Sequence, residues 1–210
     1  MRLLKKLPDQ LKAIITTLDR EQYDSINLYF QDESRFGLMT QQKRVLVSKG
    51  IKPIGKFQHS YKWVWLWGCF SPISGDAFYW ETPYVSNKVF EAFLQDFSQQ
   101  NPRELKIVIV DNAGFHALKH INIPENIHII NIPSYAPELN PAEKVWQWFK
   151  DHTAMKFFAS IEEIQQMITM LIQQLKPKMI KSITGYELYT KPFFSICCIS
   201  SIEAKNFMAV

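Results

Sequence analysis

Hydrophobic and polar positions follow regular spacings along most of this 210-residue chain, and the spacings predict an ordered series of strands and helices. Short runs rich in β-branched and aromatic residues predict strands at 25–32, 36–40, 62–70, 76–81, 105–110 and 126–132. Apolar residues at helical spacing predict helices at 1–24, 87–100, 140–158 and 160–175. Hairpin strands precede strands that alternate with helices, an order typical of a mixed sheet covered by helices.

The same pattern predicts one domain with short additions at its ends. We see no internal repeat, low-complexity tract or linker, and 210 residues suffice for one well-cored domain with a small appendage. We therefore expect a helical extension at 1–24, a domain at 25–176 and a tail at 177–210. From Lys191 onward the apolar residues follow no clear period, so the structure of the tail is left open.

Composition indicates an intracellular protein without a membrane span. Hydrophobic residues make up 47% of the chain and charged residues 21%, which is typical of a globular protein in water. The three cysteines have the spacing of neither a zinc site nor a disulfide framework, so a reducing, cytoplasmic setting is expected. The densest apolar run, at 63–70, is far too short to span a bilayer.

Basic residues gather in one stretch of the chain. Between positions 34 and 75 there is no Asp or Glu, and the basic residues there are Arg35, Lys43, Arg44, Lys49, Lys52, Lys56 and Lys62. This stretch carries +7, which leaves −3 for the remainder because the net charge of the chain is +4. A local basic surface suits an enzyme that acts on a polyanion, although a solvated face rich in lysines would give the same pattern.

Three carboxylates occupy positions that chemistry can use. Asp32 and Asp111 each close an apolar strand, and Glu143 lies in the first turn of a predicted helix. Three negative charges at close range repel one another strongly unless cations are bound between them. Carboxylate oxygens suit Mg²⁺ or Mn²⁺, so the three residues predict metal-assisted chemistry on phosphate.

Each of these carboxylates also has a structural interpretation. Asp111 would cap the turn after its strand, as Asp often does. Glu143 would complete a capping box in which Asn140 is the N-cap. Asp32 competes with Glu33, because neighbours in a strand point to opposite faces and only one of them can join the cluster. We prefer Asp32, since the apolar residues of its strand alternate onto its face, and keep Glu33 as the fallback.

The segments around these acids resemble the catalytic domain of DDE transposases, specifically the mariner-like superfamily that includes many bacterial insertion-sequence enzymes. The resemblance is carried by 30–36 (FQDESRF), 110–116 (VDNAGFH) and 133–143 (PSYAPELNPAE), followed by Trp146. The last segment is the most specific, because its order of Tyr, Pro, Leu, Asn, Pro and Glu is hard to obtain by chance. The resemblance covers residues 25–175 of the chain.

This resemblance implies an RNase H-like α/β fold of the retroviral-integrase type, with a mixed five-stranded sheet flanked by helices. It implies metal-dependent DNA cleavage and strand transfer at insertion-sequence ends, by in-line phosphoryl transfer with two Mg²⁺ or Mn²⁺ ions. Asp32, Asp111 and Glu143 would be both the catalytic residues and the metal ligands. Auxiliary roles are expected for His116, Asn112 and Asn140, although His116 would serve equally to satisfy a local backbone carbonyl.

The expected partner is double-stranded DNA, as element ends and as target. Its backbone would be held, without being read for sequence, by Arg35, Lys43, Arg44, Lys49 and Lys52. Members of the resembling family usually carry N-terminal helix-turn-helix modules, and 24 residues before the first strand cannot hold them. We therefore expect a separate or missing recognition module, and a homodimer stays open.

Two other functions stay open beside transposition. One is an RNase H-like nuclease that cuts DNA without joining strands. The other is a truncated or decayed transposase that only binds DNA or a partner, which the expected absence of a recognition module favours and the three intact acids oppose.

Overall fold

A computed structural model gives the fold of residues 7–17, 22–41, 44, 46–52, 54–55, 57–111, 121–132 and 139–196. One sheet holds five strands in the order β3-β2-β1-β4-β5. The strands are β1 (Ser25–Gly37), β2 (Trp63–Phe70), β3 (Ala77–Thr82), β4 (Glu104–Val110) and β5 (Ile127–Asn131). β1, β2 and β3 pair antiparallel, whereas β4 pairs parallel with β1 and β5. The predicted mixed five-stranded sheet is thereby confirmed.

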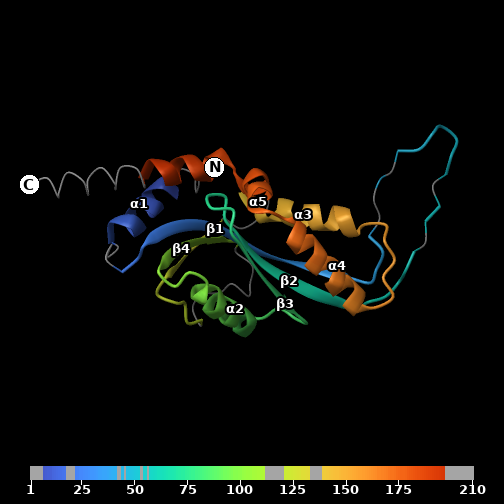
Figure 1. Cartoon of the computed structure of the whole chain (residues 1–210), viewed down its shortest axis with the longest axis horizontal. Coiled ribbons are helices and arrows are strands. Elements are labelled where there is room, and N and C mark those ends of the chain that lie inside the picture. The colour runs from blue at the N-terminus through green and yellow to red at the C-terminus, as the bar shows by residue number, and fades with distance from the viewer. Residues whose placement is uncertain are drawn as a thin grey trace, which may run out of the picture.

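Helices cover both faces of this sheet (Figure 1). They are α1 (Leu7–Thr17), α2 (Asn87–Gln99), α3 (Ala142–Thr153), α4 (Ile161–Gln174) and α5 (Pro177–Thr184). α2 lies on one face, and α3, α4 and α5 lie on the other. As expected, α2 begins after Ser86, whose hydroxyl accepts a hydrogen bond from the Val89 amide. α1 accounts for part of the helix expected at 1–24, of which 1–6 and 18–21 lie outside the described residues.

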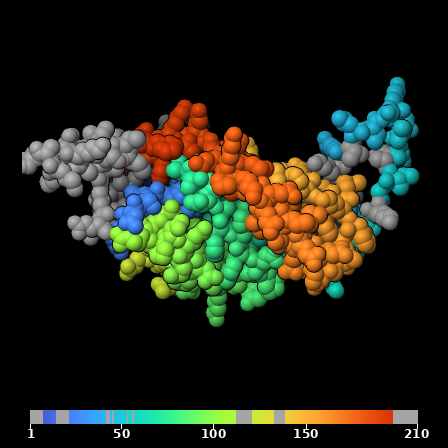
Figure 2. Space-filling view, in the orientation of Figure 1, coloured from blue at the N-terminus to red at the C-terminus, as the bar shows by residue number. Residues whose placement is uncertain are grey.

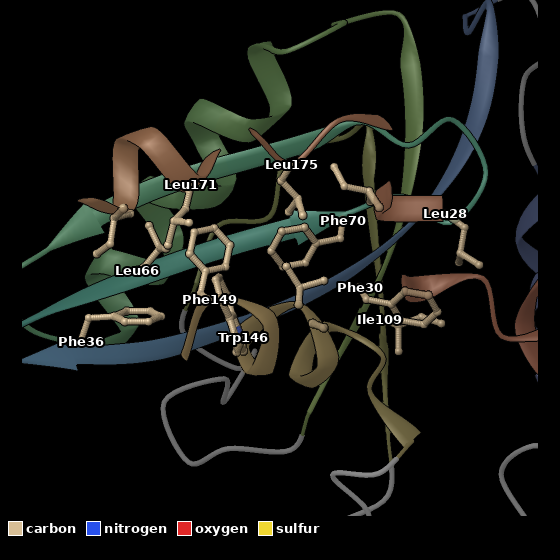
Figure 3. Packing of buried hydrophobic residues seen from close by; sticks show 14 of the residues in the cluster. Leu28, Phe30, Phe36, Leu66, Phe70, Ile109, Trp146, Phe149, Leu171 and Leu175 are labelled. Atoms are coloured by element: carbon tan, nitrogen blue, oxygen red, sulfur yellow. The ribbon is translucent and has the colours of Figure 1, made fainter. Parts of the chain in front are cut away.

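Alternation along β1 divides the interior into two apolar cores. Leu28 and Phe30 join the core under α3, whereas Tyr29 joins the core under α2. Figure 3 shows the first of these cores, in which Trp146 and Phe149 of α3 pack with residues of the sheet. The rings of Phe36 and Phe149 lie 6.0 Å apart, and those of Phe70 and Trp146 lie 5.2 Å apart. α3 is therefore tied to the middle of the sheet.

The expected strand at 36–40 does not exist as a separate element. β1 continues through Gly37, because Phe36 pairs with Val64 and Gly37 pairs with Trp63 in an unbroken ladder. A side chain at position 37 would come within 2.8 Å of the Lys62 carbonyl oxygen, so glycine permits the close approach of the two strands there. The chain between β1 and β2 then leaves the sheet and projects from the body, as the cyan atoms in Figure 2 show.

The segment after residue 176 is helical and belongs to the core. Besides α5, residues 187–196 form a helix, and Ile180, Tyr189 and Phe193 are buried in the core under α3. The Tyr189 ring meets the Phe30 ring edge-on at 4.9 Å, and its hydroxyl donates to the Leu139 carbonyl at 2.7 Å. The tail, for which the sequence pattern predicted no structure, thus packs on β1 up to residue 196. Residues 197–210 lie outside the described part.

Candidate active site

Asp32 lies where β1 extends beyond the end of β4. The parallel register pairs Phe30 with Ile109, and β4 ends at Val110. Continuing this register by two residues places Asp32 beside Asp111, on adjacent chains about 4.8 Å apart. Since residues paired across a sheet point to the same face, a register continued in this way would direct both carboxylates toward the side covered by α3. The topology therefore brings together two of the three predicted acids.

Trp146 of α3 holds the Asp32 carboxylate in place. Its indole Nε1 donates a hydrogen bond to Asp32 Oδ2 at 3.0 Å, and both side chains are almost fully buried. Gly68 pairs with Asp32 across the β1–β2 ladder. A Cβ atom at Gly68 would lie 2.8 Å from Trp146 Cη2, so the absence of a side chain leaves room for the indole. In the sequence, Trp146 follows the last segment of the resemblance without an assigned role, and no pattern indicates Gly68.

Asn140 connects the start of α3 to the strand that carries Asp32. Its side-chain Nδ2 donates to the Gln31 carbonyl at 2.9 Å, and its Oδ1 accepts from the Ala142 amide at 3.1 Å. Glu143 follows in the first turn, one turn before Trp146 and thus on a neighbouring part of the same helix face. The Glu143 side chain is exposed and hydrogen-bonds none of the described residues, so it does not close a capping box with Asn140.

Asp32 occupies an unfavourable electrostatic position. Burial raises the pKa of its carboxyl well above the ordinary value of 3.8, and the negative charges of Glu33, Glu143 and Asp111 raise the pKa further. Glu143 and Asp111 are therefore close enough to act on Asp32. Glu33 itself pairs with Trp67, whose side chain belongs to the opposite core, so Glu33 points away from Trp146.

A cluster of this composition fits hard divalent cations. Carboxylate oxygens are the ligands that Mg²⁺ and Mn²⁺ prefer, and a bound cation would remove the repulsion that raises the Asp32 pKa. Within the described ranges, no group of three or more His, Cys, Asp or Glu side chains is already arranged around one point to hold an ion.

The structure describes some of the other predicted residues and not others. Arg35 is exposed three residues after Asp32, and Arg44, Lys49 and Lys52 are exposed on the chain between β1 and β2. Lys43, Asn112 and His116 lie outside the described residues. Of the auxiliary candidates, Asn140 alone is described, and its hydrogen bonds are those of a positioning residue.

Comparison with known proteins identifies the family. The sequence model of the family described as "DDE superfamily endonuclease" matches residues 27–165, which is more than half of the chain. The chain belongs to the DDE superfamily of endonucleases. The matched region begins in β1 and ends in α4, so it contains all three acids.

Two sequence relatives of the chain are transposases. The chain is 27% identical to the Tcb2 transposase of Caenorhabditis briggsae, over 71% of this chain and 62% of that protein. It is 26% identical to the Tc1 transposase of Caenorhabditis elegans, over 56% and 48% of the two chains. It is also 29% identical to the uncharacterized protein y4pE/y4sA of Sinorhizobium fredii, over 43% of this chain and 67% of that protein.

Solved structures confirm the RNase H-like fold. The Mos1 mariner paired end complex with Mn superposes with a TM-score of 0.63 at 15% identity, over 92% of this chain and 61% of that chain. The Mos1 strand transfer complex gives a TM-score of 0.62 at 14% identity, over 92% and 60%. The chain thus spans about three fifths of the Mos1 chains, and of Tcb2, that it matches.

Proposed function

We propose that this chain is the catalytic domain of a transposase that cleaves DNA at the ends of an insertion sequence and joins those ends to a target. The observation that carries the proposal is the register of β1 and β4, which sets Asp32 beside Asp111, together with the charge of Glu143 close enough to act on Asp32. Membership of the DDE superfamily and the transposase relatives support the same reaction class.

The three carboxylates would hold two Mg²⁺ or Mn²⁺ ions. We assign Asp32 as the shared ligand, with Asp111 completing the shell of one ion and Glu143 that of the other. Bound there, the ions would lower the pKa of an attacking hydroxyl and neutralise charge on a leaving oxygen. Structures of Mos1 complexes with Mn and with Mg are consistent with this choice of metal.

The chain's own groups orient the reaction. In cleavage, a water oxygen forms a bond to a DNA phosphorus while the bond from that phosphorus to the 3′ oxygen breaks, which leaves a 3′ hydroxyl and a 5′ phosphate. In joining, the oxygen of that 3′ hydroxyl forms a bond to a phosphorus of the target while the bond from that phosphorus to the target's own 3′ oxygen breaks, which leaves a 3′ hydroxyl on the target strand. The hydrogen bond from Trp146 to one oxygen of Asp32 restricts the orientation of the carboxylate. Burial of Asp32 keeps bulk water from screening its charge.

DNA would approach over the basic surface between β1 and β2. The exposed residues Arg35, Arg44, Lys49 and Lys52 suit contacts to phosphates, which position DNA without specifying its sequence. We therefore propose that sequence-specific recognition of element ends comes from a helix-turn-helix module outside this domain. A homodimer that brings two element ends together belongs to the same proposal.

Substitution of Asp111 tests the proposed reaction. Asp111→Asn removes a negative charge from the metal site at nearly constant volume, so magnesium-dependent nicking of element-end DNA is expected to disappear while the fold remains. Asp96→Asn on the exposed side of α2 is the matched control and should nick like the unaltered chain. Gel analysis of labelled DNA measures both, and circular dichroism checks the fold.

The products of the same assay separate the candidate functions. Supplying pre-cleaved ends together with a target plasmid reveals joined DNA if the chain performs strand transfer. Cut ends without any joined product would instead indicate a nuclease. Undiminished nicking by Asp111→Asn would refute the assignment of the site.

A further inference from the structure

Four aromatic residues stand at alternate positions just before and at the start of β2, and we call them the aromatic ladder: Phe57, His59, Tyr61 and Trp63. All four are exposed, with 55% of Phe57, 66% of Tyr61 and 41% of Trp63 accessible to solvent. Ring centroids lie 6.3 Å apart between Phe57 and His59, and 4.8 Å apart between His59 and Tyr61. The rings thus form a consecutive series on the surface and are not packed into either core.

Hydrogen bonds to the chain after β1 hold the backbone of the aromatic ladder in place. The Leu38 amide donates to the Lys62 carbonyl at 3.0 Å, which continues the β1–β2 ladder past Gly37. The Thr40 amide donates to the Gln58 carbonyl at 3.2 Å, and the Gln58 amide donates to Thr40 Oγ1 at 2.9 Å. The exposed rings are therefore presented by backbone that is hydrogen-bonded to the chain after β1, and the contacts of the His59 ring with Phe57 and Tyr61 place these three side chains together.

A cavity of about 560 Å³ lies at the base of the aromatic ladder. Two ladder rings, Tyr61 and Trp63, line it together with three cations, Arg35, Lys62 and Lys150. The Arg35 guanidinium lies 5.0 Å from the centroid of the Trp63 ring, a cation–π contact. Its described lining includes no carboxylate, and the sequence has none between residues 34 and 75. The cavity therefore combines aromatic faces with positive charge, of which Lys62 is also close enough to Glu162 to lower the pKa of that carboxyl.

The cavity lies close to the carboxylates along two elements. β1 and α3 run side by side in the same direction, since Trp146 contacts Asp32 and Phe149 contacts Phe36. Arg35 follows Asp32 by three residues of strand, about 10 Å. Lys150 follows Glu143 by seven residues of helix, also about 10 Å. Along one strand of B-DNA this distance corresponds to about three nucleotides.

We propose that the aromatic ladder and the cavity at its base bind an unpaired DNA strand that leaves the cleavage site. Exposed aromatic rings beside a basic groove are the features with which proteins bind single strands, because every base has a face that stacks. Bases inside a duplex are stacked on each other and offer no such face. The inference takes its substrate class, DNA, from the proposed function, and adds a site that accepts unpaired bases beside the cut.

Binding of two single strands to the full chain tests the inference. A fluorescent oligothymidylate and a strand of equal length made of abasic nucleotides carry the same phosphates, so their difference in affinity isolates base stacking. The unaltered chain is expected to bind the oligothymidylate more tightly. Tyr61→Ala and Phe57→Ala should each weaken that binding by about 5- to 100-fold and leave the abasic strand unaffected. Fluorescence anisotropy measures both.

Tyr84→Ala is the matched control, because Tyr84 is an aromatic residue with 59% exposure outside the ladder, between β3 and α2. It should leave both affinities unchanged. Equal affinity of the unaltered chain for the two strands would overturn the inference. The inference would also be overturned if the ladder variants bound oligothymidylate normally but changed the oligomeric state measured by light scattering. In that case the ladder would be an interface between copies of the chain.

The metal site supplies a separate control. Asp111→Asn leaves the aromatic ladder intact, so it should lose nicking and retain oligothymidylate binding. If Asp111→Asn loses nicking but the ladder variants bind oligothymidylate as tightly as the unaltered chain, the single-strand site is refuted and the proposed function stands. If the unaltered chain does not nick DNA but its oligothymidylate binding depends on the ladder, the proposed function is refuted and the single-strand site stands.

Discussion

Asp32 is a carboxylate in a position where its own charge is unfavourable. It is 5% exposed, accepts a hydrogen bond from Trp146, and has the charges of Glu33, Glu143 and Asp111 close enough to raise its pKa. The indole N–H offsets only part of the cost of burying a negative charge. A divalent cation would offset more, so under the proposed function the residue is adapted to a bound state and destabilises the metal-free one.

The pH dependence of folding should reveal this adaptation. The unfolded chain releases the Asp32 proton near its ordinary pKa of 3.8, whereas the folded chain keeps it to a higher pH. In the metal-free protein, the contribution of Asp32 to stability therefore falls as pH rises from 3.8 through the raised pKa. Asp32→Asn removes this fall, so the variant should have the higher melting temperature at neutral pH. Thermal unfolding measured across pH tests this expectation.

Magnesium provides the complementary measurement. It should raise the melting temperature of the unaltered chain at neutral pH, because it binds the folded state in place of the proton. The Asp32→Asn variant should show little response. A variant that is less stable than the unaltered chain without metal at every pH would contradict this account of Asp32.

Among the elements, α3 and β2 together determine where Glu143 lies relative to Asp32. α3 is joined to β1 by Asn140 just before its start and by Trp146 six residues further along. β2 contributes the gap at Gly68 into which the indole fits. The C-terminal helix at 187–196 supports the same region, since the Tyr189 hydroxyl donates to the Leu139 carbonyl just before α3. A change in any of these contacts would move Glu143 relative to Asp32.

Gly68→Ala tests the fit between β2 and α3. The new methyl group would lie 2.4 Å from Phe70 Cζ and 2.8 Å from Trp146 Cη2, so both rings must shift. Overpacking of this kind destabilises a protein by about 1–3 kcal/mol, and the displaced indole would lose its hydrogen bond to Asp32. We expect a lower free energy of unfolding in urea together with slower metal-dependent nicking.

Gly55→Ala is the control for that substitution. Its added methyl group meets only the terminal methyl of Met155, at 3.1 Å, and that flexible side chain can move. Stability and nicking should both stay close to those of the unaltered chain. If Gly68→Ala also left both unchanged, the gap at Gly68 would not position Trp146.

Across the whole molecule, charge is distributed between a basic projection and an acidic site. The +7 of residues 34–75 belongs largely to the chain between β1 and β2, which projects from the body (Figure 2). Of the acids, Asp32 lies within β1, Asp111 directly follows β4, and Glu143 lies in the first turn of α3. A polyanion drawn to the projection is thereby brought to carboxylates that would otherwise repel it, provided that cations are bound there.

Salt dependence tests this division. Each phosphate contact made by a lysine contributes about 0.9 to the slope of log affinity against log salt for duplex DNA. Replacing Lys49 and Lys52 together by Ala should therefore reduce the slope by about 1.8 and weaken binding of all sequences alike. Lys88→Ala, on α2 at the other face of the sheet, should leave the slope unchanged. An unchanged slope in the double variant would exclude these lysines as phosphate contacts.

The sequence by itself determined the local order of this protein. Short apolar runs and helical periods located the five strands of the sheet and the helices α2, α3 and α4, because alternation and capping depend on neighbours in the chain. The pattern alone predicted two strands, at 25–32 and 36–40, where β1 is continuous, and predicted no structure for the tail. The continuous ladder with β2 and the packing of Tyr189 on Phe30 involve partners that a local pattern does not contain.

Only the tertiary structure decided how the acids are arranged. Asp32 and Glu33 are chemically alike in sequence, and the side of the sheet on which α3 packs distinguishes them. The indole that holds Asp32 comes from a residue 114 positions away, and the gap that admits it comes from a glycine on a third element. Sequence motifs proposed the chemistry of the site, whereas its geometry depends on long-range packing, which burial and strand register decide together.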